Sequence, residues 1–158
     1  MDHDALLRKQ LAALLTSGEA HADFEAAIKD LPRNLRGKVP DNAEHSAWQL
    51  VEHLRIALWD IVEFSRSAKH KSPKWPEGYW PKSPEPPNEK AWDETVEAIR
   101  ADLKVFAALI SDKDTDLYAK IPHGDGQTVL REVLLAADHN AYHVGQIVLV
   151  RRLLGAWK

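Results

Sequence analysis

Two histidines in the last third of the chain stand four residues apart. His139 and His143 lie in the segment Asp-His-Asn-Ala-Tyr-His-Val-Gly-Gln, near the end of a long apolar stretch predicted to be helical. A spacing of four places both imidazoles on one face of a helix, with Cβ atoms about 5–6 Å apart. Two such nitrogen atoms can occupy adjacent positions around one divalent metal ion. The pair therefore predicts a metal site, which calls for a third ligand elsewhere in the chain.

His53 is the best candidate for the third ligand. It lies beside the apolar face of its own predicted helix, between Leu50 and Leu54 in helical projection. The remaining histidines are interpreted as terminal, loop or helix-flanking residues, or for His21 as an ordinary core histidine on the first helix: His3, His21, His45, His70 and His123. Three imidazoles leave open positions on a metal ion, as in catalytic sites rather than closed structural ones.

Each of the two helices that carry these histidines has further polar residues on the same line. With 100° of rotation per residue, Gln49 and Asp60 fall on the same side of their predicted helix as His53. Glu132 and Gln146 fall on the same side of the last predicted helix as His139 and His143. Buried polar groups without partners cost several kcal/mol, so facing polar lines satisfy each other through a metal, water or hydrogen bonds. Asp60 and Glu132 stand about two turns, roughly 10 Å, from the histidines and are interpreted as supporting rather than catalytic groups. Gln146 either orients a ligand or fills a hydrogen-bonding role.

Helical periodicity predicts the elements that position these side chains. Apolar residues recur at three and four in four segments, near residues 4–30, 46–68, 88–111 and 128–154. Ser46 with Gln49 forms a capping-box pattern, Asn88 and Thr128 are expected caps, and Gly155 ends the last helix. No segment shows sustained strand alternation, so the expected fold is an all-α four-helix bundle in a single domain, residues 1–158.

The connection from Lys69 to Pro87 is longer than a bundle needs. It holds six of the nine prolines together with Trp75, Tyr79 and Trp80. Loops of this length are usually functional or disordered, and the aromatic residues favour packing over disorder. Two interpretations stay open: an ordered cap across one end of the bundle, or a lid or wall of a substrate site.

Composition narrows the classes of partner. The formal charge of −3 argues against nucleic-acid binding, and the absence of cysteine rules out disulfides, thiolate ligands and a cysteine nucleophile. The N-terminus lacks the features of a signal peptide, and no run is apolar enough for a membrane span, so we expect a soluble, cytoplasmic protein without a membrane partner. The last helix is apolar nearly all round, which predicts that part of its surface packs against a second copy in a homodimer.

Two segments of the chain resemble the DinB-like superfamily. Trp-Gln-Leu-Val-Glu-His-Leu (48–54) and Asp-His-Asn-Ala-Tyr-His-Val-Gly-Gln-Ile (138–147) are similar to its motif of one histidine on helix two and His-x-x-x-His on helix four. The resemblance implies an up-down-down-up four-helix bundle, usually dimeric, that binds zinc or nickel through His53, His139 and His143. Similar proteins include metal-dependent S-transferases that use bacillithiol or mycothiol and a mycothiol-dependent maleylpyruvate isomerase.

These observations support two classes of function. In the first, the chain is an enzyme acting on a small-molecule substrate, in which the metal activates a low-molecular-weight thiol for S-transfer or a water molecule for hydrolysis. Any thiol must come from a cofactor, because the chain has no cysteine. In the second, the chain is a non-catalytic metal- or small-ligand-binding bundle, which the absence of an acid or base next to the three histidines favours. Haem ligation fits poorly, because three co-facing histidines suit one small ion better.

Overall fold

The computed structural model describes residues 2–17 and 19–157 of the chain. The helices are α1 (His3–Thr16), α2 (Phe24–Ile28), α3 (Arg33–Arg36), α4 (Ala47–Arg66), α5 (Ala91–Ser111) and α6 (Val129–Leu153). Among the described residues there is no strand beyond one isolated bridge between Lys120 and Thr128. The predicted all-α class is confirmed.

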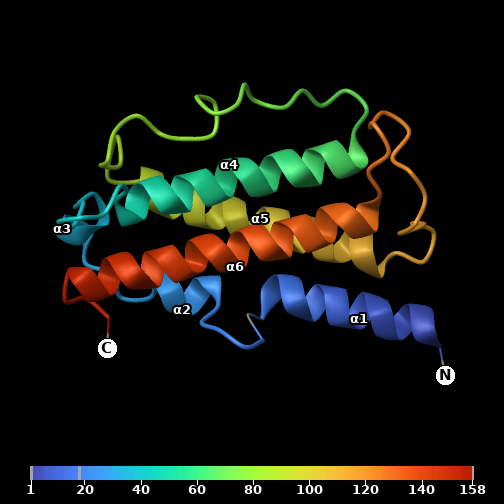
Figure 1. Cartoon of the computed structure of the whole chain (residues 1–158), viewed down its shortest axis with the longest axis horizontal. Helices are drawn as coiled ribbons and strands as arrows, with labels where there is room; N and C mark the ends of the chain where they lie inside the picture. Colours follow the sequence, from blue (N-terminus) through green and yellow to red (C-terminus); the bar gives the residue numbers. More distant parts are fainter. Residues whose placement is uncertain (1, 18, 158) are drawn as a thin grey trace.

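Three long helices form the centre of the fold, and α1 and α2 lie along one side of it. The helix α4 packs against both α5 and α6, while α1 contacts α5 and α6, and α2 contacts α6. In Figure 1, α4 and α5 run in the same direction, and α1 and α6 run in the opposite one. The connection from α4 to α5, residues 67–90, must therefore return along the length of the bundle, and it does so beside α4 (Figure 1).

The expected caps fix the helices that carry the histidines. The hydroxyl of Ser46 accepts the backbone N–H of Gln49, and the Gln49 side chain accepts the N–H of Ser46, which completes the predicted capping box of α4. At the start of α6 the Thr128 hydroxyl accepts the N–H of Arg131. After α6, Gly155 adopts a φ of +69°, the left-handed conformation that glycine provides at helix ends.

The apolar faces of α4, α5 and α6 meet in one core. Its largest fully buried side chains include Leu50, Leu58, Phe106, Ile110 and Ile147. The helix α6 buries one face in this core, but the large apolar side chains on its outer face are exposed: Leu134, Tyr142, Leu149 and Leu153. In the described ranges, none of the helices combines the length and the hydropathy that crossing a bilayer requires.

The first helix departs from the prediction. A single helix was expected from residue 4 to residue 30, but α1 ends at Thr16 and α2 begins only at Phe24. The carboxylate of Asp23 accepts the N–H of Ala26 and so caps a new helix, and Glu19 adopts a positive φ of 37° that a continuous helix does not allow. His21, expected in the core, is exposed as a result. Gly18, which the predicted helix included, lies outside the described residues.

Two smaller differences concern helix boundaries. The segment before Pro40 was expected to be irregular, but it contains the single-turn helix α3. The helix α5 begins at Ala91 rather than at residue 88, because the Asn88 side chain accepts the N–H groups of Lys90 and Ala91 just before the first full turn. Asn88 therefore satisfies donors at the helix start, as a cap does, from a position slightly further out.

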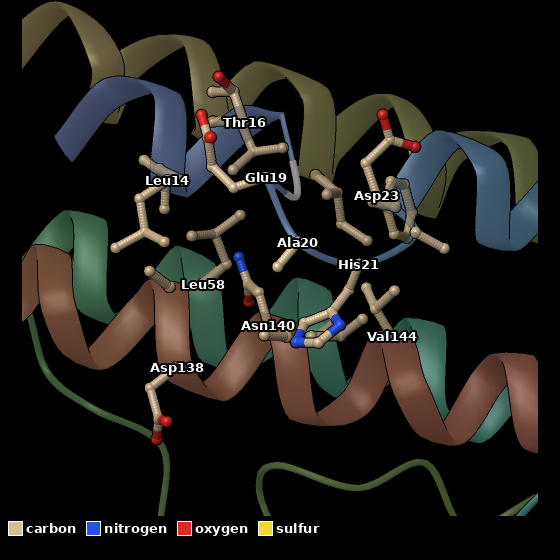
Figure 2. A pocket seen from close by; sticks show the side chains of 18 of the residues that line it. Leu14, Thr16, Glu19, Ala20, His21, Asp23, Leu58, Asp138, Asn140 and Val144 are labelled. Carbon is tan, nitrogen blue, oxygen red and sulfur yellow. The ribbon is translucent and has the colours of Figure 1, made fainter. Parts of the chain in front are cut away.

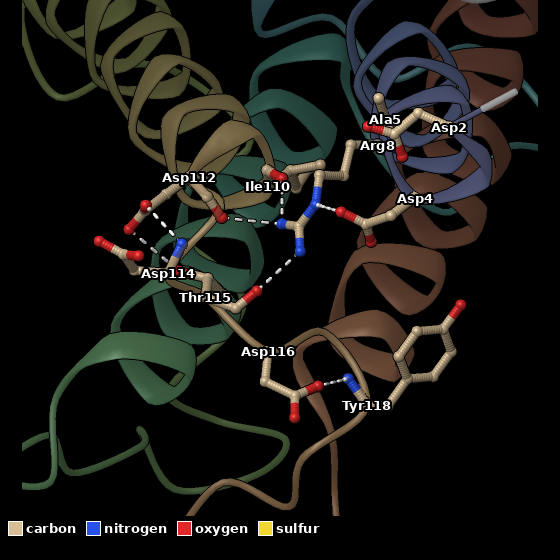
Figure 3. A network of polar contacts seen from close by, with 10 residues as sticks. All are labelled: Asp2, Asp4, Ala5, Arg8, Ile110, Asp112, Asp114, Thr115, Asp116 and Tyr118. Carbon is tan, nitrogen blue, oxygen red and sulfur yellow. Dashed lines mark hydrogen bonds and ion pairs between the residues drawn. The ribbon is translucent and has the colours of Figure 1, made fainter.

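Arg8 ties α1 to the far end of α5. Its guanidinium donates to the backbone carbonyls of Ile110, Asp112 and Thr115, each at 2.8 Å, and to the carboxylate of Asp4 at 2.6 Å. Figure 3 shows this side chain reaching from α1 into the turn that follows α5. The carbonyl of Ile110 has no helical partner, because a helix leaves its last acceptors free, and the other two carbonyls belong to the turn that follows α5. The buried arginine thus replaces the missing donors and fixes where α1 packs.

We expect Arg8→Met to lower the free energy of unfolding by about 1–3 kcal/mol, because it leaves the buried carbonyl of Ile110 without its donor while keeping the aliphatic stem. Urea unfolding followed by circular dichroism measures the change. Lys9→Met is the matched control: Lys9 is the exposed neighbour of Arg8, and its replacement should alter stability by less than about 0.5 kcal/mol. Equal effects of the two changes would contradict the role assigned to Arg8.

Candidate metal centre

The helices α4 and α6 bring the three predicted histidines together. One ring nitrogen from each of His53, His139 and His143 lies within 4.8 Å of the other two. His53 and His143 are buried, with 2% and 7% of their surface exposed, and His139 is half-buried. Among the described residues no carboxylate or further histidine joins this group. The three side chains are called the histidine triad below.

Hydrogen bonds set the tautomers of two triad rings. Nδ1 of His53 lies 2.9 Å from the backbone carbonyl of Tyr79, and a carbonyl only accepts, so Nδ1 carries the hydrogen. Nδ1 of His143 lies 2.7 Å from the side-chain oxygen of Gln146, which accepts in the same way. In a neutral imidazole the other nitrogen then holds a lone pair. The Nε2 atoms of both rings are therefore available as ligands, and Gln146 orients one of them.

His139 completes a donor set that suits a metal ion. Its Nε2 lies 3.1 Å from Nε2 of His53, where two lone pairs repel unless a proton or a cation lies between them. Two ligands at tetrahedral positions with Zn–N bonds of roughly 2.0–2.1 Å stand about 3.3–3.4 Å apart, close to the observed separation. The Nδ1 atom of His139 is buried without a hydrogen-bond partner in the described part of the chain. The arrangement fits a divalent metal held by three Nε2 atoms.

Burial keeps the triad in its neutral form. Burial, followed by the charge interaction with His53, lowers the pKa of His139 to about 4. Burial also lowers the pKa of His143 to about 4, with charge on His139 as the next cause, and burial lowers the pKa of His53 in the same direction. Neutral imidazole is the form that binds metal ions, so no proton has to leave these rings near neutral pH.

The connection between α4 and α5 lies against the triad. The Trp80 ring stacks on His53 with a centroid distance of 3.8 Å and an interplanar angle of 3°, and His45 stacks on Trp80 at 4.2 Å. Together with the Tyr79 carbonyl, these contacts place two loop residues on one ligand ring. Of the two interpretations of this loop, the contacts match a wall beside the site.

Asp60 holds this loop in place. Its carboxylate accepts the Tyr79 hydroxyl at 2.5 Å and the Nε2–H of His70 at 2.7 Å. Burial and the bond to Asp60 raise the pKa of Tyr79 to about 12. Asp60 thus acts at a distance from the triad, through the residue whose carbonyl orients His53, as its position two turns along α4 suggested.

The other predicted polar residues do not reach the triad. Gln49 belongs to the capping box of α4, and its amide donates to the Pro81 carbonyl of the loop at 3.4 Å. Glu132 is buried, with 3% of its surface exposed, and pairs with the exposed guanidinium of Arg131 at 2.7 Å. Among the four polar candidates, Gln146 alone contacts a triad ring. Gln49 and Asp60 position the loop, and Glu132 forms a local ion pair.

Two histidines that the sequence reasoning set aside belong to the surroundings of the triad. The sequence places His45 just before a helix, and the structure stacks its ring on Trp80, next to the Ser46 cap. The sequence predicts a polar loop position for His70, but its side chain is buried against Asp60. The sequence signal for these two residues is the loop: aromatic residues between prolines indicate a segment that packs against the bundle. Histidines near its two ends, such as His45 and His70, can then contact the packed loop.

Comparison with protein families identifies the chain. The family model of the DinB superfamily matches residues 18–147, which includes all three triad histidines and the loop. The chain belongs to the DinB superfamily. No match was found among curated proteins or among solved structures. Membership in this superfamily and the three-histidine cluster are compatible with a metal-dependent enzyme.

Tyr79 offers a direct test of the loop contact. Its pKa is raised from 10.0 to about 12, so the stability linked to its protonated form is present below pH 10 and is lost as pH rises through 12. We expect the wild-type protein to lose stability relative to Tyr79→Phe over that interval, measured as urea midpoints at several pH values. Tyr118→Phe, at an exposed tyrosine, should follow the wild type. A parallel loss in Tyr79→Phe would contradict burial of this hydroxyl.

Proposed function

We propose that His53, His139 and His143 bind one divalent metal ion, with zinc and nickel as the first candidates, and that the protein is a metal-dependent enzyme. One observation carries the proposal: two Nε2 atoms are left free by hydrogen bonds at the opposite nitrogens, and they converge with a third ring. Ligand rings fixed by such outer partners are typical of metal sites in proteins. Three protein ligands leave room on the ion for a further molecule.

The reaction we favour is transfer of a small-molecule thiol to an electrophilic substrate. A divalent metal, when bound, would lower the pKa of a thiol or water molecule at its open position. The thiol must be supplied from outside, because the chain has no cysteine. In the reaction the sulfur forms a bond to an electrophilic carbon, the bond from that carbon to its leaving group breaks, and the thiol proton ends on the leaving group.

The chain's own residues would prepare this reaction by holding and covering the site. Gln146 and the Tyr79 carbonyl keep the rings of His143 and His53 in the orientation that points Nε2 inward. Trp80 covers one face of His53 and limits the access of water on that side. Low water content strengthens the interaction between an ion and an anionic nucleophile. The role of Trp80 is thus to shape the approach to the site.

One observation favours a second candidate, a metal that only stabilises the bundle. His53 and His143 are almost fully buried, and an ion enclosed by protein has no need of an open position. The two candidates differ in whether a small molecule reaches the ion. Exchange of added thiol with the bound metal therefore separates them.

We expect purified protein to contain one divalent metal per chain by elemental analysis, and His143→Ala to lose it. Gln146→Leu should weaken metal binding by about 10–100-fold in a calorimetric titration, because the Nδ1–H of His143 loses its acceptor. His123→Ala is the control: its exposed ring contacts the Phe64 carbonyl and no triad residue. Metal retained in His143→Ala at the wild-type level would refute the ligand assignment.

The metal-loaded protein should also conjugate a thiol to an aryl chloride or epoxide. Bacillithiol, mycothiol and glutathione are the thiols to compare, and His143→Ala should lose the activity that His123→Ala keeps. A cobalt-substituted protein gives a second readout, because a thiolate bound to the ion adds a charge-transfer band. Full metal occupancy with neither turnover nor a spectral response to thiols would favour the stabilising role.

We also propose that the protein is a homodimer in which α6 packs against its counterpart. The side chains of Leu134, Leu149 and Leu153 are exposed on the outer face of α6. Gly145 on the same helix also faces open space, because a Cβ added there would meet no atom within 4 Å. When this face packs against the same face of a second copy, the apolar surface of both copies is removed from water, which stabilises the dimer.

We expect the molar mass from light scattering to be twice that of the chain at micromolar concentration. Leu149→Glu should convert the protein to a monomer, because it places two buried carboxylates near each other in a two-fold interface. Gln10→Glu adds the same charge at an exposed position of α1 and should leave the dimer intact. A monomeric wild type would exclude the proposed interface.

A further inference from the structure

Tyr79 is held against α4 at two points. Its backbone carbonyl accepts the Nδ1–H of His53 at 2.9 Å, and its hydroxyl donates to the carboxylate of Asp60 at 2.5 Å. His53 and Asp60 stand about two turns apart on α4, roughly 10 Å along the helix axis. The backbone and the side chain of one loop residue thus bridge two turns of the helix. Tyr79 connects a ligand ring to a carboxylate outside the triad.

A second loop residue binds the same carboxylate. Nε2 of His70 lies 2.7 Å from the other oxygen of Asp60, and the side chains of both residues are largely buried. The His70 ring also packs edge-on against Trp59, with a centroid distance of 4.8 Å. One carboxylate therefore accepts hydrogen bonds from both ends of the segment 70–79. Asp60, His70 and the hydroxyl of Tyr79 are called the loop anchor.

Between these two ends the segment is exposed. Lys74 lies in solvent, and Trp75 has 67% of its surface exposed. Gly78 packs so closely on the turn that an added Cβ would lie 2.7 Å from Pro73 and 2.9 Å from the Lys74 carbonyl. Exposed segments with few buried contacts open locally at a low cost in free energy. The position of the Tyr79 carbonyl therefore depends on the loop anchor and on this close turn.

A different side of α6 faces the break between α1 and α2. An apolar cavity of about 440 Å³ lies there, and Asn140 and Val144 of α6 belong to its lining (Figure 2). No triad residue is among its described lining residues. The contacts that hold the His53 ring come instead from the loop, through the Tyr79 carbonyl and the stacked ring of Trp80.

The bond from His53 to Tyr79 is stronger when a metal ion occupies Nε2. The ring then loses electron density to the ion, so its Nδ1–H becomes a better donor to the carbonyl. Linkage makes this effect reciprocal: if the ion favours the docked loop, the docked loop favours binding of the ion. Loss of the loop anchor should therefore lower metal affinity although every ligand is still present.

We propose that Tyr79 is a positioning residue of the metal centre, and that the loop anchor couples docking of residues 70–79 to metal binding. The inference rests on the proposed function, since it takes the triad to be a metal site. It adds a second state of that site, in which the loop is released and metal affinity is lower. Because Trp80 follows Tyr79 and stacks on the same ring, release of the loop also uncovers His53.

Two variants weaken the anchor without changing a ligand. Tyr79→Phe removes the hydroxyl and keeps the ring and the backbone carbonyl. We expect its affinity for Zn²⁺, from competition with a chelator, to be about threefold to tenfold lower than that of the wild type, as loss of one hydrogen bond predicts. Gly78→Ala keeps every anchor side chain and should also lower the affinity, because the added Cβ displaces the turn. Wild-type affinity in both variants would overturn the inference.

Two controls separate positioning from general loss of stability. Tyr118→Phe removes a hydroxyl from an exposed tyrosine, and Arg8→Met weakens the contact between α1 and the end of α5. Both should bind Zn²⁺ as the wild type does. A loss of affinity in Arg8→Met equal to that in Tyr79→Phe would assign the effect to stability and contradict the role of Tyr79.

Trypsin cleavage after Lys74 reports on the loop itself, because cleavage follows the population of the opened segment. Saturating Zn²⁺ should slow this cleavage in the wild type by at least the factor lost in the affinity of Tyr79→Phe, since both effects have one cause. Without the ion, Tyr79→Phe should be cleaved faster than the wild type. Lys113, exposed after α5, is the internal control, and its cleavage should not respond to Zn²⁺. Equal responses at Lys74 and Lys113 would contradict the coupling.

A last readout does not require the ion. In the metal-free protein the Nδ1–H of His53, identified by its absence in His53→Ala, should give an NMR signal that exchanges slowly with water. This signal should exchange faster in Tyr79→Phe and stay unchanged in Tyr118→Phe. If the wild type binds no Zn²⁺, the proposed function fails, and the signal still decides whether Tyr79 positions the ring. If the wild type and both anchor variants bind Zn²⁺ equally, only the present inference fails.

Discussion

The fold is organised around the cost of placing imidazole nitrogens in an apolar interior. The helices α4 and α6 bury mainly apolar side chains, yet they also contain the rings of His53 and His143 with almost no exposed surface. Each buried nitrogen needs a partner, because an unpaired polar atom costs free energy there. The Gln146 side chain accepts from Nδ1 of His143, and the Tyr79 carbonyl accepts from Nδ1 of His53. The Nε2 atoms of both rings still need a partner, and their position defines the centre of the site.

Polar groups solve the same problem elsewhere in the bundle. Arg8 supplies donors to the carbonyls that follow α5, and Arg151 supplies them to Ala27 and Ala156 near the other end. Both arginines are buried, and both donate to backbone carbonyls at helix ends or in the segments that follow them. Arg8 and Arg151 thus each hold one end of the bundle, and the packing of the core between them positions the histidines.

The parts of the site that follow from local periodicity could be predicted, and the parts that depend on the chain path could not. The spacing of His139 and His143, and the position of His53 beside an apolar face, are properties of one helix at a time. The acceptor for His53 is a backbone carbonyl, which every residue has, so no side-chain pattern marks it. The break after α1 was missed because the apolar spacing continues through it, although Asp23 is a typical cap.

The parallel direction of α4 and α5 has an evolutionary consequence. Two parallel neighbours need a connection that spans the bundle (Figure 1), and here its residues Tyr79 and Trp80 contact His53. Loops accept substitutions and insertions more readily than packed helices do. The helices and the backbone carbonyl of Tyr79 can therefore keep the ligand geometry while other side chains of residues 67–90 change, so one scaffold can acquire new substrate preferences through this loop.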